Sequence, residues 1–114
     1  MGLDQQAYTK DEEGTYHPIQ DWRKHNALDG WMEALWRTKG NDGEWNCSEL
    51  ELTKEDIERL EDVVKRDALP ETIGFFYGGD SRYSAYQKKE TLKFILEAKY
   101  LLDEGEKVFY SAWF

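Results

Sequence analysis

The sequence predicts a small α+β domain, or a small α/β domain, in which helices pack on a three-stranded sheet. Three observations indicate this class. Stretches with a helical apolar period alternate with short apolar runs, glycine-containing breaks separate them, and 15% of the 114 residues are aromatic. The expected order is helix, strand, helix, strand, helix, strand, within a single globular domain over residues 21–114. A chain of this length is the size of one domain.

The first 20 residues are predicted to be an N-terminal arm. They are polar, they include an acidic stretch at 11–13, and neither a helical nor a strand period runs through them. Such a segment is expected to be flexible unless it is tied to the body of the domain. We therefore expect order here only if Tyr8, Tyr16 or Pro18 packs on the rest of the protein.

A first helix is predicted from Asp21. Five apolar residues follow at helical spacing and form one stripe: Leu28, Trp31, Met32, Leu35 and Trp36. The glycines of 40–43 end this helix. A short strand is expected over 45–52, where Trp45 and Cys47 alternate with polar neighbours.

A second helix is predicted after Thr53. Thr53 and Asp56 resemble a capping box with Asp in the third helical position, and the helix is expected to end near Leu69 and Pro70. Its expected buried residues are Ile57, Leu60, Val63 and Val64. An apolar run at 73–77 predicts a buried strand, and glycines at 78–79 turn the chain. A third helix is predicted over 84–103, ending at Gly105, and a strand buried on both faces over 107–114.

Charge and composition restrict the classes of function. The formal net charge is −9, so binding to a nucleic-acid backbone through Lys and Arg is not expected. A basic protein surface remains a suitable partner. The single cysteine excludes an internal disulfide, and neither a signal peptide nor an apolar run long enough to span a membrane is seen. We therefore expect a cytoplasmic protein with no membrane contact and no cofactor.

The first candidate ligand site is a basic, aromatic segment formed by Trp22, Arg23, Lys24 and Asn26. Arginine and lysine at the start of a helix would bind phosphate or carboxylate, and Trp22 would stack on a ring. The alternative is structural: Trp22 anchors the helix to the core, and the two cations pair with some of the 24 acidic residues.

The second candidate segment supplies Phe76, Tyr77, Arg82 and Tyr83. It would place a pocket at the end of a strand, where open α/β sheets usually bind ligands. The glycine pattern is neither a phosphate-binding loop nor a dinucleotide fingerprint. The alternative is a core strand followed by a turn.

Metal binding and nucleophilic catalysis have little support. The nitrogen and sulfur donors are His17, His25 and Cys47, and their spacing matches no zinc pattern. Cys47 and His25 could in principle form a nucleophilic pair. The alternative is that Cys47 is a small core residue. No catalytic residue is predicted.

Several of these segments together resemble a family of small uncharacterised proteins encoded by tailed bacteriophages and prophages. They are the Trp-Arg-Lys segment with Asn26 and Trp31, the single Cys47, the 69–78 segment, and the ending with Tyr110, Ser111 and Trp113. The resemblance covers residues 21–114. Asp29 stands where the family pattern has histidine. The resemblance implies a phage accessory protein acting in the host cytoplasm, and it implies no catalytic residue.

These observations lead to one expected function and two alternatives. The expected function is a non-enzymatic accessory protein that binds a host-derived ligand, such as a nucleotide-like anion, and modulates a host pathway or defence. The first alternative is an acidic protein that inhibits a host protein by occupying a basic surface. The second alternative is a small enzyme acting on a nucleotide. The oligomeric state is not predicted.

Overall fold

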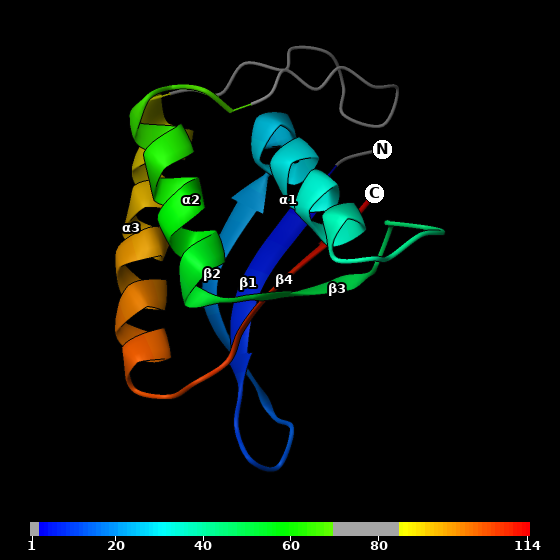
Figure 1. Cartoon of the computed structure of the whole chain (residues 1–114), viewed down its shortest axis with the longest axis vertical. Helices are drawn as coiled ribbons and strands as arrows, with labels where there is room; N and C mark the ends of the chain where they lie inside the picture. The colour runs from blue at the N-terminus through cyan, green and yellow to red at the C-terminus, as the bar shows by residue number, and fades with distance from the viewer. Residues whose placement is uncertain (1–2, 70–84) are drawn as a thin grey trace.

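The computed structural model describes residues 3–69 and 85–114, which form three helices and a four-stranded antiparallel sheet (Figure 1). The order along the chain is β1 (Asp4–Lys10), β2 (Tyr16–Arg23), α1 (Asn26–Thr38), β3 (Glu49–Leu52), α2 (Lys54–Lys65), α3 (Ala85–Asp103) and β4 (Val108–Trp113). The strand order in the sheet is β2-β1-β4-β3. The predicted α+β class is correct, whereas the predicted three-stranded sheet lacks both β1 and β2.

The segment predicted as an arm is ordered where the structure describes it, and it forms β1 and most of β2. Tyr8, one of the residues whose packing was the condition for order, is buried and stacks on Phe109 of β4. β1 is a central strand that pairs with both β2 and β4. Leu3, Ala7 and Tyr8 are buried. The strand pattern is hidden in the sequence because Gln5, a polar residue, occupies a buried position. Its side-chain amide donates to the His25 carbonyl at 3.1 Å and to the Tyr110 hydroxyl at 2.8 Å.

A tight turn joins β1 to β2. The Asp11 carboxylate accepts from the backbone N–H groups of Glu13 and Thr15, both at 2.9 Å. Gly14 has a φ of 83°, a left-handed conformation that glycine adopts without a steric penalty. The acidic stretch that suggested an arm is therefore a hairpin turn.

α1 begins later than predicted. Asp21, Trp22 and Arg23 belong to β2, and the helix starts at Asn26 after the capping residue His25. The His25 ring accepts from the backbone N–H of Leu28 at 3.4 Å. Because Lys24 lies between strand and helix with a φ of 55°, the helical period cannot extend back to Asp21. The predicted apolar stripe of α1 packs against the core.

α2 begins as predicted and ends early. Thr53 and Asp56 form the reciprocal capping box, with bonds of 3.2 and 2.9 Å. The helix ends at Lys65 because Asp67 adopts a left-handed φ of 53°. The N–H groups of Asp67 and Ala68 then close back onto the carbonyls of Val64 and Val63, the bonds of a Schellman motif. The sequence does not predict this helix end because position 67 is aspartate and not the glycine that usually follows such a C-terminus.

The last two elements are close to their predicted bounds. α3 ends in a second Schellman motif around Gly105, the residue predicted to stop it. β4 buries Val108, Phe109 and Tyr110 on alternate faces, but Ser111 is half-buried and Trp113 is exposed, so the predicted burial on both faces holds only for the first half of the strand. The predicted strand at 73–77 lies outside the described residues.

The strand predicted over 45–52 is shorter in the structure. Only Glu49–Leu52 forms β3, and residues 45–47 belong to the preceding turn. Cys47 has a φ of 66° and an exposed side chain, so the expectation of a core cysteine is wrong.

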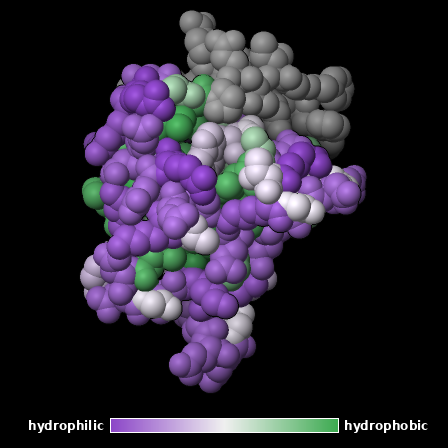
Figure 2. Space-filling view, in the orientation of Figure 1, coloured by the Kyte–Doolittle hydropathy of each residue, from purple (hydrophilic) through white to green (hydrophobic). Residues whose placement is uncertain are grey.

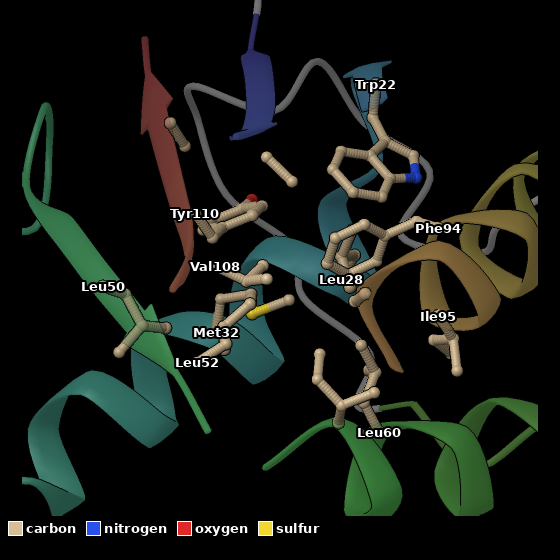
Figure 3. Packing of buried hydrophobic residues seen from close by; sticks show 14 of the residues in the cluster. Trp22, Leu28, Met32, Leu50, Leu52, Leu60, Phe94, Ile95, Val108 and Tyr110 are labelled. Carbon is tan, nitrogen blue, oxygen red and sulfur yellow. The ribbon is translucent and has the colours of Figure 1, made fainter. Parts of the chain in front are cut away.

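The three helices of residues 3–69 and 85–114 pack on one face of the sheet, and none of them covers the other face. Residues that alternate along the strands, among them Trp22, Leu50, Val108 and Tyr110, point to the helical side and form one core with the helices (Figure 3). Trp22 meets Phe94 of α3 edge to face at 5.2 Å. The outer side of α2 is mostly hydrophilic, whereas pale and hydrophobic patches are visible at the place of α1 (Figure 2). The strand residues that alternate with these core residues point to the opposite face of the sheet, which we call the open face.

Candidate functional site

A row of polar and aromatic residues crosses one end of the open sheet face. The strand register places Trp113 of β4 beside Asp4 of β1, and Asp4 beside Arg23 of β2. The next row places Gln6 beside Asp21. Because alternate residues of a strand share a face, these five side chains belong to the open face.

α3 runs beside the edge strand β2 and forms one side of this region (Figure 1). The Trp22 indole N–H donates to the Thr91 hydroxyl at 3.0 Å. The Gln20 amide donates to the Glu90 carboxylate at 3.4 Å, and the Gln87 amide donates to the Arg23 carbonyl at the same distance. These bonds fix the first turns of α3 against the strand.

The end of the sheet and the start of α3 enclose a hollow of about 630 Å³. We call it the β2–α3 hollow. Its lining combines carboxylates, amides, one guanidinium and three aromatic rings, contributed by Asp4, Gln5, Gln6, Asp21, Trp22, Arg23, Tyr86, Gln87, Glu90 and Trp113. Its volume is within the range of sites that hold a small ligand or a large side chain.

Two of the aromatic residues in the hollow are open to solvent. Tyr86 is 69% exposed and Trp113 is 43% exposed, whereas Trp22 is 3% exposed and belongs to the core. Large exposed aromatic side chains are enriched at interaction sites because they contribute much contact area with little loss of conformational freedom. The two exposed rings therefore make the hollow a candidate contact site.

The charge in the hollow is negative. Arg23 Nε lies 3.2 Å from Asp4 Oδ1, so these two charges compensate each other. Asp21 accepts from the Gln6 amide at 3.2 Å, and Glu90 accepts from the Gln20 amide. Amides are neutral, and neither Asp21 nor Glu90 forms an ion pair with any residue of 3–69 or 85–114. Two uncompensated carboxylates consequently face this hollow.

Of the four predicted site residues that the structure describes, two line the hollow, Trp22 and Arg23. Lys24 does not line the hollow; its backbone N–H donates to the Leu3 carbonyl at 2.8 Å. Asn26 is buried in the first turn of α1. Because Arg23 lies in a strand and Lys24 in a left-handed turn, the expected phosphate site at a helix start does not form. The other four predicted residues, Phe76, Tyr77, Arg82 and Tyr83, lie outside the described residues.

A buried polar cluster lies between α1 and the sheet. Asp29 is fully buried and accepts from the Tyr110 hydroxyl at 2.8 Å and from the Trp45 indole N–H at 3.1 Å. Burial lowers the pKa of His25 to about 4, so this ring is neutral at pH 7. Asp29 therefore binds core aromatic residues. His25 is inside and Cys47 is on the surface, which gives no support to a nucleophilic pair.

A second cluster lies on the open face toward the end of the sheet at which the β1–β2 turn is found. Lys10 lies over the ring of Phe109 at 4.5 Å and over the ring of Tyr16 at 5.1 Å. Its ammonium lies 2.8 Å from Glu49, which also accepts from the Tyr8 hydroxyl at 2.5 Å. Burial, and then the bond to Glu49, raises the pKa of Tyr8 well above its ordinary value. The groups in this cluster satisfy one another.

The described part of the chain has neither a metal-binding cluster nor a membrane-spanning helix. Across residues 3–69 and 85–114, no three His, Cys, Asp or Glu side chains converge as a metal-binding group. Within the same ranges, no helix combines the length and the apolar composition that crossing a membrane requires.

The sequence interpretation missed most of the hollow. Asp4 and Gln6 lie in the predicted N-terminal arm, and Asp21 is the first residue of the predicted first helix. Tyr86 and Glu90 belong to a correctly predicted helix, but nothing in a single sequence says that its first turns lie beside β2. The strand alternation around Tyr110 was the one available signal, because it places Trp113 on the face opposite the core.

Comparison of the whole chain with known proteins found no match, whether to a family model, a curated protein or a solved structure.

Proposed function

We propose that the protein is a non-enzymatic accessory protein that binds a positively charged segment of another protein in the β2–α3 hollow. The observation that carries this proposal is the combination of two exposed aromatic rings with two carboxylates that have no ion-pair partner among the described residues. An aromatic face attracts a cation through its quadrupole, and the carboxylates attract it through their charge. The resemblance to phage proteins suggests a host protein as this partner.

The charge of the whole chain supports the same partner class. A net charge of −9 raises the rate of encounter with a basic surface and lowers it for an anionic one. The hollow therefore favours the acidic-protein alternative over a nucleotide-like anion. For an anion, the charge of Arg23 is already compensated by Asp4, and the ligand would lie close to Asp21 and Glu90.

The test is a binding titration with two matched dye-labelled peptides, followed by fluorescence anisotropy at low and at physiological salt. One peptide alternates Lys and Arg with Gly and Ser, and the other has Glu at every charged position. We expect the basic peptide to bind, to lose affinity as salt is raised, and to bind weakly to the double variant Asp21→Asn, Glu90→Gln.

The matched control variant is Glu97→Gln, the same change on the same helix, at an exposed position that does not line the hollow. It should bind as the unchanged protein does. If neither peptide binds while nucleotides raise the melting temperature, the anion-binding alternative replaces this proposal.

A further inference from the structure

We infer that the β2–α3 hollow selects arginine over lysine in the partner segment. This inference rests on the proposed function and adds the side chain that the site recognises. It depends on three properties of the hollow: how its carboxylates are held, which rings flank them, and what the chain's own arginine does there.

The two carboxylates come from different elements and are held in place. Asp21 lies on β2 and is bound by Gln6 from β1, while Glu90 lies on α3 and is bound by Gln20 from β2. Each amide donates to one carboxylate oxygen, and because an amide is neutral, the negative charge of the carboxylate is not compensated. A guanidinium has five N–H donors spread over a plane and can donate toward two carboxylates from one position. An ammonium has three donors at one point and keeps more of its hydration.

The exposed rings give the guanidinium a second advantage. Tyr86 is presented by the first turn of α3, and Trp113 by the last residue of β4. A planar guanidinium can stack on an aromatic ring while its edge still donates hydrogen bonds. An ammonium over the same ring has to turn some of its donors away from the carboxylates.

The chain itself shows the same chemistry beside the site. Arg23 donates from Nε to Asp4 within the hollow, and its side chain remains 81% exposed. A guanidinium is thus accommodated at one carboxylate of this surface without being buried. A second one, from a partner, would meet the carboxylates of Asp21 and Glu90, which line the same hollow.

The experiment compares blocked single amino acids: N-acetyl-arginine methylamide, its lysine analogue and its citrulline analogue. Citrulline keeps the shape of arginine and lacks its charge. Binding is followed by the indole N–H signals of the five tryptophans in two-dimensional NMR, with Trp113→Phe identifying one of them. We expect a roughly tenfold lower Kd for arginine than for lysine, a ratio equal to about 1.4 kcal/mol, and no shift with citrulline.

The response of the protein locates the binding. The Trp113 signal should move most, and the Trp22 signal should move less because its N–H is already bonded to Thr91. Asp21→Asn with Glu90→Gln should abolish the shifts, and Glu97→Gln should leave them unchanged. A melting curve for each variant shows that it is folded.

The outcomes separate the two proposals. Equal affinity for arginine and lysine would overturn the selectivity and leave cation binding standing. Binding of neither cation, together with no binding of the basic peptide, would overturn both. Shifts confined to residues outside the hollow would overturn the assignment of the site.

Discussion

His25 couples the stability of the fold to pH. Burial lowers its pKa from about 6.5 to about 4, so between these values the unfolded chain binds a proton that the folded chain does not. The free energy of unfolding should therefore fall as the pH is lowered from about 6.5 to about 4. The full effect of this one group is about 3 kcal/mol, at 1.36 kcal/mol per unit of pKa. Urea melts across this pH range measure it.

The matched variant is His25→Asn, which keeps a side-chain acceptor for the N–H of Leu28 and removes the titration. Its stability should change little over the same range. Carboxylates act at lower pH: burial alone would raise the pKa of Asp56, but bonds from Lys39 and Thr53 outweigh it and lower the pKa. Equal slopes for the two proteins above pH 4.5 would show that His25 is accessible to protons in the folded state.

At the scale of elements, β4 should be indispensable. It lies between β1 and β3, and Tyr110 bonds to Asp29 beneath the sheet. Removing residues 110–114 takes away a fully buried ring and most of the pairing with β1. A domain has about 5–15 kcal/mol of stability, so we expect the truncated chain to lose its cooperative thermal transition.

A smaller change at the same strand serves as the control. Trp113→Ala removes a side chain that is 43% exposed, and it should leave the protein folded. If the chain truncated at residue 109 still melts cooperatively, β4 contributes far less to the fold than its central position indicates. Circular dichroism at several wavelengths distinguishes these outcomes.

How far the sequence predicted each element depended on where its information lay. α3 and β4 were predicted because their period, their stop signals and their apolar residues are local. β1 was missed because its buried Gln5 is stabilised by His25 and Tyr110, which are 20 and 105 residues away. α2 was predicted too long because aspartate at position 67 adopts the conformation usually given to glycine.

The same distinction explains the candidate site. Trp22 and Arg23 were selected for their residue types, and both do line the hollow. Asp21 was one of 24 acidic residues, and its role depends on Gln6 across the strand pair. The position of Glu90 depends on how α3 lies against β2, which is a property of the tertiary fold. Chemistry-bearing residue types are visible in a sequence, but their convergence is not.

At the scale of the whole molecule, the net charge should make stability depend on salt. With a charge of −9, the folded chain repels itself over distances comparable to its longest extent of 39 Å, because the screening length at 0.01 M salt is about 30 Å. We expect the free energy of unfolding to rise by about 1 kcal/mol or less between 0.01 and 0.5 M sodium chloride. The change is small because interactions between exposed charges are weak, and an exposed ion pair typically contributes only about 0–1 kcal/mol.

Urea melts at the two salt concentrations measure this dependence, because urea carries no charge. Sodium chloride also weakens ion pairs such as Lys10 with Glu49 and Arg37 with Glu33, which opposes the gain. A loss of stability at high salt would mean that these pairs outweigh the repulsion. The variant Glu12→Gln provides a control, because it removes one exposed charge from the hairpin turn and should reduce the salt dependence slightly.

The order of the strands also has a kinetic consequence. In the described sheet, β3 pairs only with β4, and α2 and α3 separate the two strands along the chain. The β1–β2 hairpin and the α2–α3 helix pair are built from nearer segments and can form early, whereas β4 must enter a gap bounded by a strand on each side. Closing such distant contacts is the slow event in folding. The transition state for folding is therefore expected to be set by the arrival of β4, with the hairpin already formed, so that destabilising substitutions in the hairpin turn and at Val108 should both slow refolding.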